Sequence, residues 1–87
     1  MGNIKFEVIN ENMKGERFYA LFKVSHKDND GYCVAVQDDE FSVQGIGDNF
    51  NRASELYNLL LCAEVSAIHV GDVVRDMQND FQSGIFV

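Results

Sequence analysis

Hydrophobic and polar residues alternate along the first half of the chain, as they do in strands that bury one face. The first such run covers residues 4–8 and the second covers residues 18–24, with a turn near Gly15 between them. In the second run the even-numbered positions form one face, and the odd-numbered positions, which include Tyr19 and Leu21, form the other. The pattern predicts two antiparallel strands, of which the second is central.

Two further reversals extend this pattern. Residues 27–31 are rich in turn formers and end in Gly31, which can adopt positive φ, so a third strand is predicted near residues 32–37. The polar residues 38–40 predict another turn before a short strand that includes Phe41 and Val43. Strands that follow one another through short turns form a meander, here over residues 3–47.

From Asp48 onward the apolar period changes to that of a helix. Asp48 can cap a first helix, and Ser66 precedes a second one. The apolar stripes of the two helices comprise Phe50, Ala53, Leu56, Tyr57, Leu60 and Leu61, then Val70, Val73, Val74, Met77 and Phe81. Because the connection at residues 63–65 is short, we expect two antiparallel helices on one sheet face. The predicted fold is α+β, ββββαα, with its helical pair over residues 48–81.

Length and composition indicate one globular domain over residues 1–87. The chain has 87 residues, of which 46% are hydrophobic and 24% charged, the composition of a folded protein. After the second helix and a flexible joint, residues 82–87 form an apolar tail.

The charge balance and the cysteines narrow the possible functions. A formal charge of −7 opposes binding to nucleic acid, where affinity comes from Lys and Arg on phosphates. No segment approaches the ~20 apolar residues of a membrane span, so no membrane partner is expected. Cys33 and Cys62 lack metal-site spacing and are too few for a disulfide framework. These features predict reduced thiols and a cytoplasmic protein.

Histidine and acids offer a metal site as an alternative function. His69, Asp72 and Asp76 lie three and four residues apart on the second predicted helix, so they could bind a metal or small ligand. The other interpretation makes His69 part of the helix start and the acids a solvated face. For catalysis a cysteine would need a histidine brought close by folding, whereas buried structural thiols are commoner. We therefore expect no catalytic residues and no cofactor.

A second apolar sheet face points to a protein interface. If the helices cover one face of the sheet, the other carries Tyr19, Leu21, Cys33 and Ala35, which are more apolar than a solvated surface. Its occupant could be a second copy, another protein, or the chain's own tail at Ile85, Phe86 and Val87. The leading hypothesis is a self-associating protein-interaction module without catalysis, whose partner is a second copy, as in a homodimer, or another protein.

The second helix also resembles a known family. The motif Ser66-Ala67-Ile68-His69-Val70 followed by Asp72-Val73-Val74-Arg75-Asp76 is similar to the C-terminal segment of a small bacterial family, a domain of unknown function. The resemblance covers roughly residues 43–81. It implies a fold, and it supplies no catalytic residues because the family has no established activity.

Overall fold

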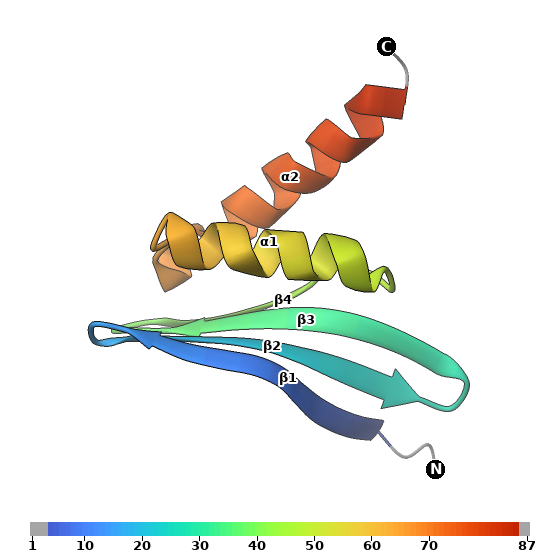
Figure 1. The fold of residues 1–87 in the computed structure, drawn as a ribbon, viewed down its shortest axis with the longest axis horizontal. Helices are drawn as coiled ribbons and strands as arrows, with labels where there is room; N and C mark the ends of the chain where they lie inside the picture. The colour runs from blue at the N-terminus through green and yellow to red at the C-terminus, as the bar shows by residue number, and fades with distance from the viewer. Residues whose placement is uncertain (1–3, 86–87) are drawn as a thin grey trace.

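The computed structural model describes residues 4–85, with side chains through Met77. Four antiparallel strands form one sheet in the order β1-β2-β3-β4, and two helices follow (Figure 1). A short 3₁₀ helix, η1, connects the helices. The elements are β1 (Ile4–Lys14), β2 (Arg17–His26), β3 (Asn29–Gln37), β4 (Phe41–Gly45), α1 (Phe50–Cys62), η1 (Ala67–His69) and α2 (Val70–Ile85). The predicted ββββαα fold is confirmed.

Both helices lie on the same side of the sheet. Figure 1 shows α1 crossing above the strands and α2 rising obliquely away from them. The start of α2 lies close to β4 and η1, while α1 packs over β2 and β3. No helix within residues 4–85 has the length and apolar character needed to cross a membrane.

The core lies between the helices and one face of the sheet. Its residues come from β2, β3, the position just after β4, both helices and η1, and all are at most 7% exposed. They are Tyr19, Leu21, Val34, Val36, Ile46, Ala53, Leu56, Tyr57, Leu60, Ala67, Val70 and Val74. The apolar period of each helix therefore predicts the residues that it buries.

Two buried tyrosines connect the sheet to the helical layer through their hydroxyl groups. The Tyr19 hydroxyl donates to the backbone oxygen of Val65, in the connection after α1, at 2.8 Å. The Tyr57 hydroxyl donates to the backbone oxygen of Tyr19 at 3.3 Å and accepts from Asn12 Nδ2 at 3.1 Å. A buried hydroxyl without a partner would be costly, so these bonds allow tyrosine at both positions.

Three details of the helix limits differ from the prediction. Asn49, not Asp48, caps α1, because its Oδ1 accepts the backbone N–H of Arg52 at 3.1 Å. Ser66 precedes η1 without a side-chain cap, and α2 proper begins at Val70. α2 continues to Ile85, four residues past the predicted end of the helical pair at residue 81.

The hairpin between β2 and β3 is tighter than predicted. His26 pairs with Asn29, so the loop contains two residues, with Lys27 at a φ of 58°. Gly31 lies within β3 and does not supply the positive φ expected of it. The pairing therefore sets Leu21 opposite Val34, and Ala35 opposite Ala20. Residues directly opposite each other share a face, which separates Cys33 and Ala35 from Tyr19 and Leu21.

For β2, the face covered by the helices is the opposite of the predicted one. Tyr19 is fully buried and Leu21 is 2% exposed, both under the helices. Neither is available to an external partner, and the interface prediction is wrong for both. An apolar face without a covering layer does exist, but the even-numbered residues of β2 form it.

Candidate functional site

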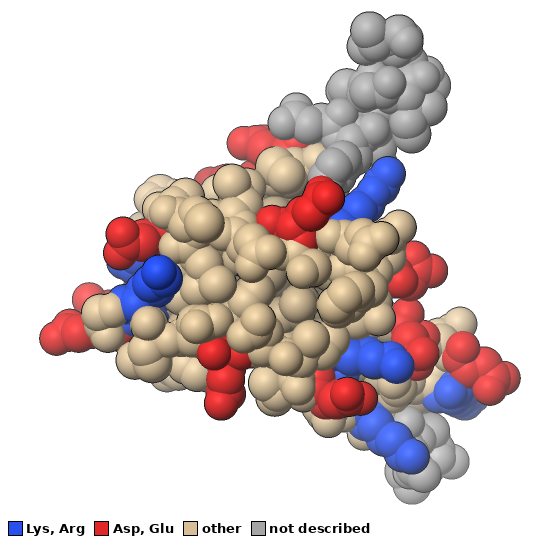
Figure 2. Space-filling model, viewed as in Figure 1, with Lys and Arg blue, Asp and Glu red and all other residues tan. Residues whose placement is uncertain are grey.

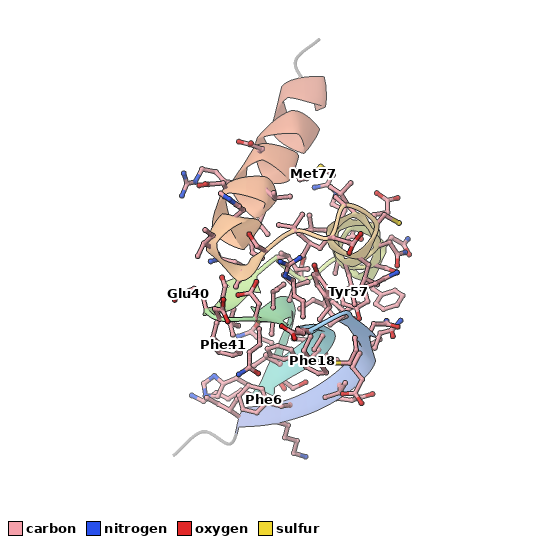
Figure 3. The ribbon with its side chains drawn as sticks, turned by 90° about the vertical axis from the view of Figure 1, so that its left-hand side faces the viewer. Phe6, Phe18, Glu40, Phe41, Tyr57 and Met77 are labelled. Carbon is pink, nitrogen blue, oxygen red and sulfur yellow. The ribbon has the colours of Figure 1, made fainter. Side chains whose placement is uncertain are left out.

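The side of the sheet away from the helices, here called the open face, is almost entirely apolar. The pairing of the strands places its members opposite one another. They include Phe6, Val8, Met13, Phe18, Ala20, Phe22, Val24, Gly31, Cys33, Ala35, Phe41, Val43 and Gly45. In Figure 3, Phe6, Phe18 and Phe41 lie on the side of the sheet away from Tyr57 and α1.

Several large side chains of the open face are exposed. Phe6 is 67% exposed, Phe41 65% and Met13 61%. The Phe6 ring lies 6.1 Å from that of Phe22, measured between centroids, and is tilted by 56°. Ala35, which lies between Ala20 and Val43 in neighbouring strands, is 8% exposed. All of β1 is exposed, since its apolar side chains lie on the open face.

The interior of the open face carries no charge among residues 4–45. Glu11, opposite Ala20 on the edge strand, supplies its one carboxylate, and His26 lies at its end. The charged groups of the molecule lie elsewhere, and on the side shown in Figure 2 acids and bases are intermixed around the outline. Two copies of this acidic chain could therefore appose their open faces without bringing many like charges together.

A hollow interrupts the open face at one end of β3 and β4. Gly31 and Gly45 lie on the open face there, and Val24 and Cys33 line the hollow with them. A Cβ built on Gly45 would meet no atom within 4 Å, so the space above this residue is empty. Burial raises the pKa of the Cys33 thiol, which is half-buried. Cys62, by contrast, is exposed.

The edge of the sheet at β1 is protected against strand addition. The pairing shifts between Val8 and Asn10, which leaves Ile9 as the extra residue of a β-bulge. The same strand carries four charged side chains, Lys5, Glu7, Glu11 and Lys14. Bulges and edge charges are the usual means by which proteins prevent edge-to-edge pairing. The open face, rather than the edge, is therefore the surface suited to a partner.

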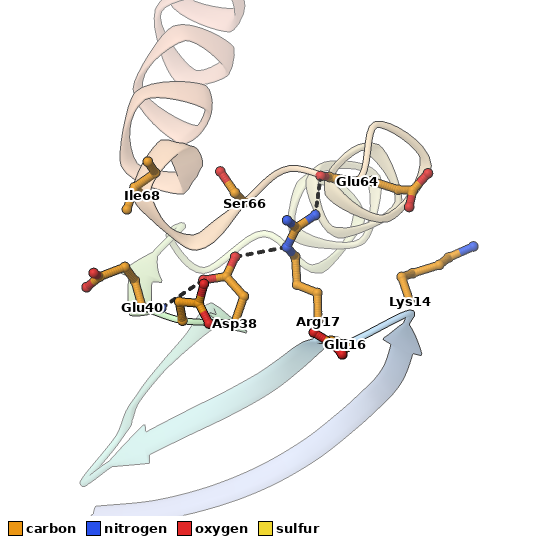
Figure 4. A pocket seen from close by; sticks show the side chains of 9 residues that line it. Lys14, Glu16, Arg17, Asp38, Glu40, Glu64, Ser66 and Ile68 are labelled. Atoms are coloured by element: carbon orange, nitrogen blue, oxygen red, sulfur yellow. Dashed lines mark hydrogen bonds and ion pairs between the residues drawn. The ribbon is translucent and has the colours of Figure 1, made fainter.

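A second surface feature, the junction around Arg17 and Asp38, holds the sheet to the connection between the helices (Figure 4). Arg17 Nε lies 2.9 Å from Asp38 Oδ2, and Arg17 Nη1 donates to the backbone oxygen of Glu64 at 2.7 Å. Asp38 also accepts the backbone N–H groups of Glu40 at 2.9 Å and Ala67 at 3.0 Å. A groove between the sheet and the connection after α1 is lined by Arg17, Asp38, Glu40 and Glu64, and the bonds make it a structural junction.

The junction predicts an acid-sensitive contribution to stability. The amides of Glu40 and Ala67, and then Arg17, hold the pKa of Asp38 below its usual value of 3.8. The stabilisation is therefore fully present above that value and is lost as the pH falls through the lower folded-state pKa. We expect Asp38→Asn to lower the melting temperature at pH 7 and to flatten its fall below pH 4. Melting curves from pH 2 to 7 measure this. Asp39→Asn, at an exposed neighbour, should behave like the wild type.

The remaining candidate residues do not form a site. Within the described side chains, no group of three His, Cys, Asp or Glu residues is arranged to hold a metal ion. His69 is exposed at the end of η1, and Asp72 forms an exposed pair with Arg75 at 3.9 Å. No hydrogen bond joins a cysteine to a histidine among residues 4–77. The metal-site alternative thus has no geometric support.

The tail candidates cannot be placed on the surface. Ile85 ends α2 but its side chain lies beyond those described, and Phe86 and Val87 fall outside the described residues altogether.

The open-face residues that the sequence did not predict are those of the edge strands, Phe6 and Phe41 above all. A signal was available, because both faces of β2 are apolar while only one can lie under two helices.

The resemblance of residues 43–81 to a bacterial family stays a prediction, and the function must be argued from the open face itself. Comparison with protein-family models, curated proteins and solved structures finds no match to this chain.

Proposed function

We propose that this protein is a self-associating interaction module whose open face binds the open face of a second copy. The observation that supports this is the uncovered apolar sheet face. Monomeric proteins rarely expose a continuous apolar patch of more than a few hundred Å². With strands of about ten residues rising ~3.3 Å each and four strands spaced ~4.8 Å apart, this face projects roughly 500–600 Å².

That area is close to what a stable interface requires. Standard interfaces bury about 800 Å² on each partner, and the projecting side chains of Phe6, Phe41 and Met13 add to the flat projection. Two such faces would pack as the sheets of a β-sandwich do, about 10 Å apart. The result is four layers, with the helices of each copy on the outside.

A second copy fits this face better than a charged partner does. Complementary charges across an interface normally accelerate association and select a partner. The open face offers one carboxylate, Glu11, near its edge, so it provides little for a basic protein to recognise. An identical neutral face matches it, as twofold interfaces require.

The test compares two lysine substitutions on opposite sides of the molecule. Val43, 44% exposed, lies on the open face, and Leu59, 38% exposed, lies on α1. We expect the wild type and Leu59→Lys to sediment as dimers at micromolar concentration and Val43→Lys as a folded monomer. Sedimentation velocity measures mass, and circular dichroism checks the fold.

The two cysteines provide a second readout of the same experiment. Dimerisation should slow labelling of Cys33, on the open face, as protein concentration rises, and leave labelling of exposed Cys62 unchanged. In Val43→Lys both rates should be independent of concentration. A wild-type chain that remains monomeric at 100 μM or above, or an equal dimer in Val43→Lys, would contradict the proposal.

A further inference from the structure

We infer that, in the homodimer, the ring of Phe6 of each copy enters the hollow beside Gly45 of the other. The inference rests on the proposed function and specifies how the two open faces meet. The two edges of the sheet differ at the level of the hollow. There β1 carries large exposed side chains and β4 carries none.

The two edges are complementary at this level. On β1, Phe6 lies opposite Val24, and Val8 lies opposite Phe22. On the other side of the same rows, Gly31 pairs with Val24 and Gly45 pairs with Cys33. Large side chains therefore project at the β1 edge, and the space above the β4 edge is empty. Phe6 is 67% exposed, so its ring projects from the surface.

The symmetry of a dimer decides which edges meet. Two faces in contact must be related by a twofold axis lying in the plane between them. If that axis runs across the strands, each β1 lies over the other β1, which places large side chains against large ones. If it runs along the strands, each β1 lies over the partner's β4. In the second arrangement, Phe6 of each copy lies over the hollow of the other. Well-packed layers alternate large and small residues in this way.

The hollow can accept an aromatic ring without rearrangement. Its volume is about 500 Å³, and its lining combines Val24, Gly31, Cys33, Gly45 and Gly47 with Tyr32, Asn29 and the two acids Asp30 and Asp48. Gly45 has no positive φ, and a Cβ there meets nothing within 4 Å. A side chain added at Gly45 would therefore fill the hollow while leaving the monomer intact.

A double-mutant cycle tests this contact. Within one copy, Phe6 and Gly45 lie on opposite edges, three strand spacings or about 14 Å apart. Residues more than about 7–10 Å apart usually contribute independently, so any coupling between them must arise across the interface. We expect Phe6→Ala and Gly45→Val each to weaken dimerisation at least about tenfold. The double variant should be little weaker than either single one, since a filled hollow costs nothing once the ring is gone.

A control cycle combines Gly45→Val with Phe41→Ala in place of Phe6→Ala. Phe41 is the other strongly exposed aromatic residue of the open face. Sedimentation equilibrium gives each dissociation constant, and melting curves at low micromolar concentration confirm folding, with Gly45→Ala as the substitute if Gly45→Val is unstable. If Phe6→Ala and Gly45→Val weaken dimerisation independently, so that their fold-losses multiply in the double variant, the inference is overturned. Coupling of Gly45 to Phe41 instead of Phe6 would also overturn it. Neither result would contradict the proposed dimer. A monomeric wild type would overturn both the inference and the proposed function.

Discussion

Leu21→Lys is expected to unfold the protein, because the leucine is 2% exposed beneath the helices. An ammonium group buried without a partner costs several kcal/mol, and the lost packing adds about 2–5 kcal/mol. A domain of this length has a total stability of roughly 4–13 kcal/mol. The variant should therefore lack a cooperative thermal transition, as circular dichroism would show.

The neighbouring residue supplies a matched control. Phe22 follows Leu21 in β2, points to the open face and is only partly buried. A lysine there keeps its charged end in solvent, so Phe22→Lys should remain folded and monomeric. Leu21→Lys that melts like the wild type would show that the helices do not cover the odd-numbered face. Two adjacent positions thus test the assignment of both faces.

Leu60→Ala is expected to cause the largest loss among conservative truncations. Leu60 is fully buried where α1 meets the sheet. Removing its isobutyl group should cost about 2–5 kcal/mol. Since each kcal/mol lowers the melting temperature of a small domain by roughly 4–8 °C, we expect a decrease of at least about 8 °C. Chemical denaturation gives the free energy of unfolding directly.

The control for this truncation lies two residues earlier on the same helix. Asn58 is exposed, so Asn58→Ala should change the free energy of unfolding by no more than about 0.5 kcal/mol. If Leu60→Ala and Asn58→Ala had the same effect, the helix would be rotated relative to the arrangement described. The slope of unfolding against denaturant should stay unchanged in both variants, because neither alters the surface exposed on unfolding.

The fold was predictable because each period in the sequence has one structural meaning. The change from a period of two to a period of 3.6 near Asp48 marks where the sheet ends and the helices begin. The buried residues of α1 all lie on its predicted stripe. A stripe on a helix has one orientation relative to the core, so the sequence specifies both the element and its buried side.

The choice of sheet face could not be made in the same way. Both faces of β2 are apolar, so alternation alone leaves two solutions. The hairpin decides between them: a five-residue loop at residues 27–31 pairs odd with odd positions, whereas the actual two-residue loop pairs odd with even. A register change of one residue moves every side chain to the other face. That loop length depends on Lys27 adopting a positive φ, which no pattern of hydrophobicity records.

The candidate site was predicted in kind but not in composition. An apolar sheet face beyond the helices was expected, yet of its proposed members Ala35 and Cys33 lie on the open face and Tyr19 and Leu21 do not. The edge strands were harder still, because β1 continues to Lys14, six residues past the predicted run of residues 4–8. Pairing with β2 along its whole length maintains the strand over these residues.

The placement of both helices on one side of the sheet limits how large an assembly can grow. In the proposed dimer, each copy would bury its open face against the open face of the other. Within the described side chains, residues 4–77, the outside of such a pair carries no second apolar sheet face to recruit a third copy, and the bulge and charges of β1 resist strand addition at that edge. Such a pair is a closed dimer. As the protein concentration rises, the measured molecular mass should therefore reach a plateau at that of the dimer, and no fibre should form.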